Sequence, residues 1–149
     1  MKKILVVCMG NICRSPTGEA VLRARAASQG IDVLVDSAGT IGYHQGDAPD
    51  KRAQAAGEAR GYSFFGIKAR QVSDEDFETF DMILAADKDN LADLKQRCPS
   101  HLKYKLSLFL SHGNSCYREI PDPYYGGEQG FELVLDLIEE AADAVLAKL

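Results

Sequence analysis

The sequence lacks the features that mark membrane, secreted and modular proteins. No apolar stretch approaches the roughly 20 residues of a membrane span. The apolar run from Ile4 to Val7 meets polar Asn11 and Arg14 soon afterwards, so it is too short for the hydrophobic region of a signal peptide. Internal repeats, low-complexity segments and linkers are also missing. We therefore expect one domain over residues 1–149, in the cytoplasm and without membrane association.

Cysteine and histidine do not form the patterns of a metal site. The cysteines are Cys8, Cys13, Cys98 and Cys116. The histidines are His44, His101 and His112. There is no C-x-x-C pair, and the histidines are not spaced with cysteines as zinc ligands are. In a cytoplasmic chain such cysteines are usually reduced thiols. We expect no metal and no cofactor, a structural role for Cys98 and Cys116, and surface histidines.

The sequence also has fewer basic than acidic residues. The chain carries 17 Lys and Arg against 22 Asp and Glu, which gives a net charge of −5. An acidic protein of this kind is a poor candidate for binding nucleic acid or anionic membranes. A local anion site remains compatible with it. Apolar residues make up 46% of the chain, which is enough for one core.

Short apolar runs rich in β-branched residues alternate with helical patterns along the chain. Strands are expected at residues 2–7, 31–35, 81–86 and 104–108. Helices are expected at residues 16–28, 51–60, 88–96 and 131–149, with a short one beginning at Ser73. This alternation predicts an α/β fold with a four-stranded parallel sheet and helices on both faces. Ligands of such folds bind at the carboxyl ends of the strands.

Individual residues indicate where some helices begin and end. Ser15 is a good N-cap with Pro16 in the first turn, and Gly30 suits the end of that helix. Ser73 and Asp76 stand in capping-box positions. The final helix has an apolar face that should pack on the domain. That face comprises Phe131, Val134, Leu135, Ile138, Ala141, Ala142, Val145 and Leu149.

The loop after the first strand carries the pattern C-x5-R, from Cys8 to Arg14. A short loop that curls over a helix N-terminus points several backbone N–H groups inward, and these favour an anion. Gly10 and Asn11 tolerate the positive φ that such a curl needs. Arg14 offers a planar fork for two phosphate oxygens. Cys8 would lie at the floor, where the positive surroundings stabilise its thiolate and place it for in-line attack. The pattern predicts a phosphate-binding loop after strand 1.

The oxygen that leaves when a thiolate attacks a phosphate ester needs a proton donor from elsewhere in the chain. The long irregular segment 111–130 contains Asp122 between Pro121 and Pro123, which stiffen the backbone. Loops of that length in a compact domain are usually functional. An aspartate there is also common in an ordinary solvated turn, so the segment alone leaves both interpretations open.

C-x5-R-S near the N-terminus and D-P-Y-Y near the C-terminus together resemble the low-molecular-weight protein tyrosine phosphatases. The S-A-G-T stretch from Ser37 to Thr40 and the A-R-Q stretch from Ala69 to Gln71 also fit. The resemblance covers essentially the whole chain. It implies a phosphotyrosine-protein substrate, with a tyrosine kinase among the candidates, and no metal.

The resemblance also implies roles for particular residues. Cys8 would be the nucleophile, Arg14 would bind phosphoryl oxygens, and Asp122 would act as general acid and then as base. Ser15 would stabilise the Cys8 thiolate, and Asn11, in a left-handed conformation, would brace the loop together with Ser37. The phosphate loop as a whole comprises Cys8, Met9, Gly10, Asn11, Ile12, Cys13, Arg14 and Ser15.

A phosphotyrosine requires a deep cleft with apolar sides. Tyr124 and Tyr125 follow the candidate acid directly, and Tyr43 matches a position where the family often carries an aromatic residue. Met9 is expected to line the same cleft. Ile12 stands where phosphoarginine phosphatases tend to carry threonine, which favours phosphotyrosine here.

Two further expectations depend on the resemblance. Cys13 is expected to close a disulfide with an oxidised Cys8 and so protect it. Some members have a histidine two residues before the A-R-Q stretch, where this chain has Ile67. We therefore expect the network that supports the loop to differ in detail from theirs.

Other functions on the same fold stay open at this point. An arsenate reductase needs a relay of further cysteines, and Cys98 and Cys116 are far apart in sequence. A phosphoarginine phosphatase is a second alternative. A third is a module that carries phosphate on Cys8 without hydrolysing it, which would need neither Asp122 nor aromatic walls.

Overall fold

A computed structural model describes residues 1–124 and 128–149. The strands are β1 (Lys2–Cys8), β2 (Val33–Gly39), β3 (Met82–Ala85) and β4 (Leu106–Leu108). The α-helices are α1 (Arg14–Gln29), α2 (Lys51–Ala59), α3 (Asp74–Thr79), α4 (Lys88–Arg97) and α5 (Glu128–Ala147). Two 3₁₀ helices, η1 (Ser100–Lys105) and η2 (Phe109–His112), flank β4.

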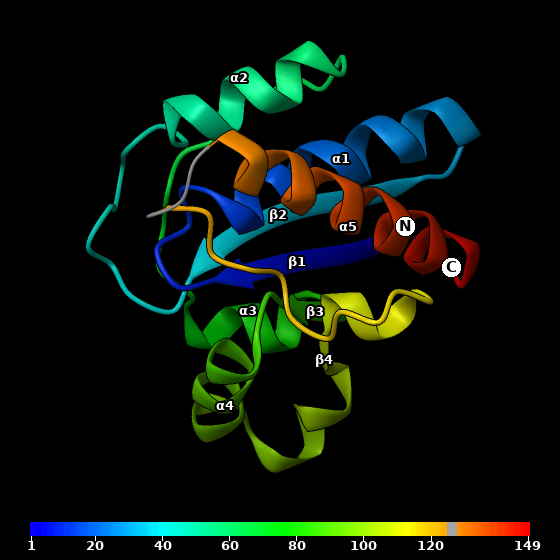
Figure 1. The fold of residues 1–149 in the computed structure, drawn as a ribbon. Coiled ribbons are helices and arrows are strands. Elements are labelled where there is room, and N and C mark those ends of the chain that lie inside the picture. The colour runs from blue at the N-terminus through cyan, green and yellow to red at the C-terminus, as the bar shows by residue number, and fades with distance from the viewer. Residues whose placement is uncertain (125–127) are drawn as a thin grey trace.

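The strands form one four-stranded sheet in the order β2-β1-β3-β4, and every pair is parallel. Helices α1, α2 and α5 lie on one side of the sheet, and α3 and α4 lie on the other (Figure 1). The expected fold class is therefore confirmed. Its carboxyl edge is formed by the ends of β1, β2, β3 and β4, from which the loops of the site emerge.

Strand β1 is central and separates two apolar cores. Ile4 and Val6 point into the core beneath α1 and α5, whereas Leu5 and Val7 point into the core beneath α3 and α4. All four side chains are fully buried. A strand covered on both faces needs a continuous apolar run rather than an alternating one, which explains the composition of this segment.

The boundaries of β2 and β4 differ from those expected from the sequence. β2 begins two residues later than expected and continues to Gly39 because all seven of its residues pair in register with β1. It is an edge strand, so polar Asp36 and Ser37 are tolerated there. β4 is shorter than expected because Tyr104 and Lys105 belong to η1.

Two of the expected helix-end signals are present in the structure, and two are not. Gly30 ends α1 in the left-handed conformation, and Ser73 forms the expected capping box with Asp76. The prediction that Ser15 caps α1 is wrong: the cap position is Cys13, and Ser15 lies inside the first turn. Its hydroxyl is engaged with Cys8 and Asn11 instead. Leu149 was also assigned to the wrong place, because α5 ends at Ala147 and Leu149 is exposed.

Candidate active site

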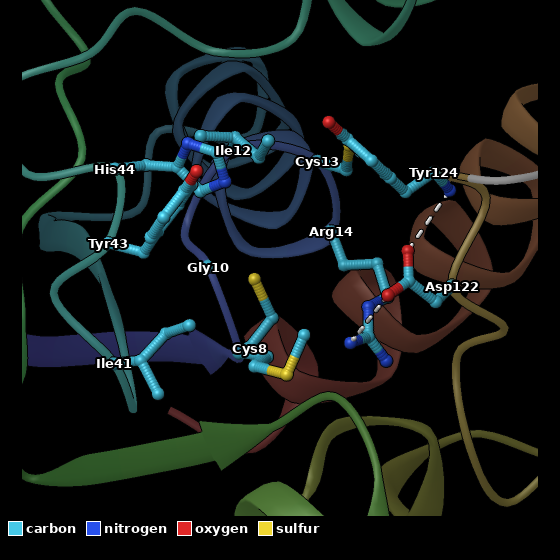
Figure 2. A pocket seen from close by; sticks show the side chains of 11 residues that line it. Cys8, Gly10, Ile12, Cys13, Arg14, Ile41, Tyr43, His44, Asp122 and Tyr124 are labelled. Atoms are coloured by element: carbon cyan, nitrogen blue, oxygen red, sulfur yellow. Dashed lines mark hydrogen bonds and ion pairs between the residues drawn. The ribbon is translucent and has the colours of Figure 1, made fainter.

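The loop between β1 and α1 forms the floor of a cavity of about 330 Å³ at the carboxyl edge of the sheet. Figure 2 shows the side chains around it. The lining residues are Cys8, Met9, Gly10, Ile12, Cys13, Arg14, Ile41, Tyr43, His44, Asp122 and Tyr124. Three distant segments of the chain therefore meet here: the loop after β1, the loop after β2 and the segment before α5.

Cys8 is the last residue of β1, and its thiol lies at the base of this cavity. The backbone N–H of Asn11 points at Cys8 Sγ from 3.3 Å, and Ser15 Oγ lies 3.0 Å from the same sulfur. Both contacts come from the curl of the loop and the first turn of α1. The sulfur therefore lies among hydrogen-bond donors, as expected of a stabilised thiolate site.

Asn11 fixes the shape of the loop. It has a φ of 58°, the left-handed conformation expected for it. Its Nδ2 donates to Ser15 Oγ at 2.8 Å and to Ser37 Oγ at 3.0 Å. Its Oδ1 accepts the backbone N–H of Arg70 at 3.0 Å, which determines which way the amide faces. The brace between the loop and β2 is thus made by buried, paired polar groups.

The far end of this brace is a buried carboxyl group that sequence reasoning missed. Ser37 donates its hydroxyl hydrogen to Glu19 Oε1 at 2.6 Å. Burial raises the pKa of Glu19, while the Ser37 bond and the nearby Arg23 act in the opposite direction. Because Ser37 donates to Glu19, its oxygen is left to accept from Asn11.

Gly10 and its surroundings differ from the expectation. Gly10 is not among the residues with positive φ, so the turn does not require a glycine there. A Cβ on Gly10 would lie 3.1 Å from Cδ2 of the His44 side chain, a tight contact that requires the imidazole to shift slightly. The His44 side chain is 22% exposed and lines the cavity, so this surface histidine also belongs to the candidate site.

Arg14 opens α1 and is almost fully buried, with 4% of its side chain exposed. Its Nη1 donates to Asp87 Oδ2 at 2.7 Å and to the carbonyl of Ile120 at 3.0 Å. Burial lowers the pKa of Arg14, but the negative charges of an ionised Cys8 and of Asp87 outweigh it and raise the pKa overall. The guanidinium is therefore a fixed, charged fork on the wall of the cavity (Figure 2).

Asp122 reaches the cavity from the opposite side to Tyr43 and His44 (Figure 2). Its Oδ1 accepts the backbone N–H of Tyr124 at 3.0 Å, and its Oδ2 lies 3.6 Å from Arg14 Nη2. The side chain is 38% exposed, so the carboxyl group remains open to solvent and to a bound molecule. The expected meeting of Cys8, Arg14 and Asp122 around one cavity is what the fold produces.

The expected aromatic walls lie on the two sides of the cavity. Tyr43 is 83% exposed and meets the His44 ring edge-to-face, with 4.8 Å between ring centroids. Tyr124 stands on the Asp122 side (Figure 2). Met9 and Ile12 also line the cavity, as does Ile41, which sequence reasoning missed. Tyr125 lies outside the described residues.

The comparisons with known proteins agree with this geometry. The model of the family described as "Low molecular weight phosphotyrosine protein phosphatase" matches residues 3–149. A putative low molecular weight protein-tyrosine-phosphatase of Synechocystis is 44% identical, over 99% of this chain and 96% of its own. The human low molecular weight phosphotyrosine protein phosphatase is 41% identical, over 99% and 95%. The chain belongs to the low molecular weight phosphotyrosine protein phosphatase family. It is therefore an enzyme of the protein-tyrosine-phosphatase type.

Solved structures of this phosphatase family have the same fold. A protein tyrosine phosphatase of Entamoeba histolytica, crystallised with HEPES in its active site, superposes with a TM-score of 0.96 at 41% identity. That match covers 99% of this chain and 96% of the other. Wzb of Vibrio vulnificus, in complex with benzylphosphonate, gives 0.87 at 34% identity, over 99% of each chain.

In this phosphatase the remaining cysteines differ from one another. Cys13 belongs to the loop and lines the cavity, and burial, with Asp50 close by, raises the pKa of its thiol to about 12. Cys98 is buried beneath α4, as a structural role requires. Cys116 is exposed, contrary to the expectation of a structural residue. All four cysteines are free thiols.

Other residues of the phosphatase were placed where sequence reasoning gave little guidance. Ile67 is buried in the core beneath α1 and α5, and the brace to Asn11 comes from the backbone of Arg70 three residues further on. Asp87 follows β3 at the same edge as Cys8. That position was the one signal that could have identified it as a partner of Arg14. Among the described residues, no helix is long and apolar enough to cross a membrane.

Proposed function

We propose that this phosphatase hydrolyses phosphotyrosine in proteins through a phosphate ester on Cys8. One observation carries the proposal: Cys8, Arg14 and Asp122 converge on one cavity, with the sulfur at its base and the carboxyl group at its wall. A nucleophile, an oxygen-binding cation and a proton donor are the three groups that the reaction requires.

The first step transfers the phosphoryl group to the enzyme. The Cys8 thiolate attacks phosphorus, the S–P bond forms, and the bond to the tyrosine oxygen breaks. Arg14 and the backbone N–H groups of the loop hold the phosphoryl oxygens, so no metal is needed. Asp122 gives its proton to the departing oxygen, and the dephosphorylated tyrosine side chain leaves with its protein.

The second step regenerates the enzyme. Asp122, now ionised, takes a proton from a water molecule, and that water's oxygen attacks phosphorus. The S–P bond breaks, phosphate leaves, and the Cys8 thiolate and protonated Asp122 return. Ser15 supports the thiolate in both steps. Asn11 donates to Ser15 Oγ, so the hydroxyl hydrogen of Ser15 points away from Asn11, and the sulfur at 3.0 Å is a closer acceptor than the Ala38 carbonyl oxygen at 3.4 Å.

The choice of tyrosine is supported by the walls of the cavity. Tyr43, Tyr124 and Ile12 offer apolar and aromatic sides to an aryl ring, and ring-on-ring packing adds about 0.5–1.5 kcal/mol beyond the burial of area. The side chains of phosphoserine and phosphothreonine are too short to span such walls and reach Cys8. A tyrosine-phosphorylated kinase is one candidate for the protein substrate.

Turnover of an aryl phosphate in the presence of a metal chelator tests this proposal. Wild-type protein should release inorganic phosphate over many cycles, and Cys8→Ser should abolish release. Asp122→Asn should lower kcat/KM by about 10²–10⁴-fold, because the leaving oxygen then lacks its proton donor.

Two results would contradict the proposal. Release of one equivalent of the phenol, with the phosphate retained on the protein and no further turnover, would indicate a phosphoryl carrier. Unchanged turnover in Asp122→Asn would remove Asp122 from the reaction. Peptides carrying phosphotyrosine, phosphoserine or phosphoarginine, compared under the same conditions, test the substrate class.

A further inference from the structure

Arg52, in the first turn of α2, contacts the segment that carries Asp122. Its Nη2 donates to the carbonyl oxygen of Tyr124 at 3.0 Å. Tyr124 in turn donates its backbone N–H to Asp122 Oδ1. Arg52 is therefore two hydrogen bonds away from the carboxyl group proposed to protonate the leaving group.

The guanidinium of Arg52 also packs against two aromatic rings. Its Cζ lies 5.5 Å from the ring centroid of Tyr124 and 4.9 Å from that of Phe131. Both distances are within the range of cation–π attraction. Phe131 belongs to α5, so the same group joins α2 to the start of α5 and to the segment between Pro121 and Tyr124.

The other end of this connection is fixed to the phosphate-binding loop. Asp50 Oδ1 accepts Arg52 Nε at 3.1 Å, and Asp50 Oδ2 accepts Nη2 at 3.0 Å. Asp50 also caps α2, and its backbone N–H donates to the carbonyl oxygen of Ile12 at 2.7 Å. A continuous series of bonds thus runs from Ile12 in the loop, through Asp50, Arg52 and Tyr124, to Asp122.

We propose that Arg52 is a positioning residue that holds Asp122 at a fixed distance from the phosphate-binding loop. The inference rests on the function proposed above, because it concerns the acid of that reaction. Arg52 itself does not line the cavity and touches no reacting atom. It acts by fixing the backbone on which the Asp122 carboxyl group depends.

The physical reason is the sensitivity of proton transfer to geometry. A displacement of about 1 Å at a reacting group can cost roughly 10²-fold in rate. Asp122 is 38% exposed, so few packing contacts restrain it, and its restraint comes from the bond to the Tyr124 backbone and from Arg14 Nη2, 3.6 Å away. Lysine cannot replace Arg52 in this role, because a single ammonium group lacks the planar fork and the stacking face.

The experiment compares two substrates that differ in their need for an acid. The phenolate released from phenyl phosphate is strongly basic, so its departure depends on protonation. The 4-nitrophenolate released from 4-nitrophenyl phosphate is a stabilised anion and depends on it much less. Arg52→Ala is expected to lower kcat/KM for phenyl phosphate by about 10- to 100-fold. The loss for 4-nitrophenyl phosphate should be several-fold smaller. Arg52→Lys should show the same selective loss.

Arg60 provides the matched control, because it also joins α2 to α5 but does not touch the Asp122 segment. It pairs with Glu132, Asp136 and Glu139. Arg60→Ala should leave the ratio of the two substrates unchanged. Competitive inhibition by inorganic phosphate should also be unchanged in Arg52→Ala, because the anion loop stays intact, and this shows that the variant is folded.

The outcomes separate the inference from the function on which it rests. An equal loss on both substrates, or no loss, in Arg52→Ala would overturn the positioning role, provided that Asp122→Asn still discriminates between the substrates. If wild-type protein and Asp122→Asn do not differ on phenyl phosphate, the proposed function itself is wrong.

Discussion

At the scale of single residues, hydrogen-bond direction explains why so many polar side chains lie behind the loop. The backbone N–H of Arg70 turns the Asn11 amide so that its two hydrogens face Ser15 and Ser37. Each hydroxyl therefore accepts from Asn11 and must point its own hydrogen elsewhere. For Ser37 the acceptor is Glu19, and for Ser15 the acceptors in reach are the Cys8 sulfur at 3.0 Å and the Ala38 carbonyl oxygen at 3.4 Å. This network thus holds the Ser15 hydroxyl beside the sulfur, to which the backbone N–H of Asn11 also donates.

Cys13 provides a test at this scale. Mild peroxide should oxidise Cys8 to a sulfenic acid, and the Cys13 thiolate should then attack that sulfur and release water, leaving a Cys8–Cys13 disulfide. Because burial raises the pKa of Cys13 to about 12, the disulfide should form faster as the pH rises towards that value. Mass spectrometry of peroxide-treated wild-type and Cys13→Ser protein measures it. Recovery of a stable Cys8 sulfinic acid in the wild type would refute the protective role.

At the scale of elements, the distance between α1 and β1 is set by a glycine. A Cβ on Gly18 would lie 2.9 Å from Val6 Cγ1 and 3.0 Å from Phe109 Cε2. The helix can approach the strand closely only because this side chain is absent. The approach matters for function because β1 ends at Cys8 and α1 begins at Arg14.

Replacing Gly18 by alanine should therefore destabilise the protein. Alanine normally stabilises a helix interior by about 0.5–1 kcal/mol relative to glycine. Here overpacking should reverse the sign, with a net loss of about 1–3 kcal/mol in the free energy of unfolding. Gly130→Ala in α5 is the control, since its nearest contact would be an ordinary 3.4 Å. Denaturant unfolding of both variants measures the difference, and a stabilised Gly18→Ala would contradict the packing argument.

At the scale of the whole molecule, charge opposes the substrate. The protein carries a net charge of −5, and Asp47 stands exposed beside His44, which lines the cavity. The cations nearest the cavity are paired: Arg14 is buried against Asp87, and Arg52 is paired with Asp50. Local donors bind the phosphate, while the surrounding field repels anions.

Phosphotyrosine peptides with basic flanking residues should therefore be better substrates than matched acidic ones. At low ionic strength the basic peptide should have the higher kcat/KM, mainly through faster association. The difference should shrink as salt is added, because charges more than about 10 Å apart are screened at 0.1 M. Initial rates for the two peptides across a sodium chloride series measure this. A preference for the acidic peptide, or one that salt does not change, would contradict it.

The sequence by itself determined the fold class and the anion loop with Cys8 and Arg14 at its two ends, whereas the residues around Asp122 left its role open and the resemblance indicated it. It did so because these features are local. Hydrophobic alternation specifies strands and helices, and C-x5-R places a cysteine and an arginine at the two ends of one loop. The capping box at Ser73 also follows from neighbouring residues alone, whereas the resemblance singled out Asn11 rather than Gly10 as the left-handed residue.

Only the tertiary structure decided which distant groups complete the site. Asp87, Glu19, Arg52 and His44 reach it because β1, β2 and β3 end at one edge and α2 begins beside the loop. The prediction from local sequence was also wrong for Ser15. Local rules make its hydroxyl a helix cap, but in the fold this hydroxyl contacts Cys8 and Asn11. A buried polar group forms hydrogen bonds with the groups that the fold places next to it, and helix or capping propensities cannot predict those partners.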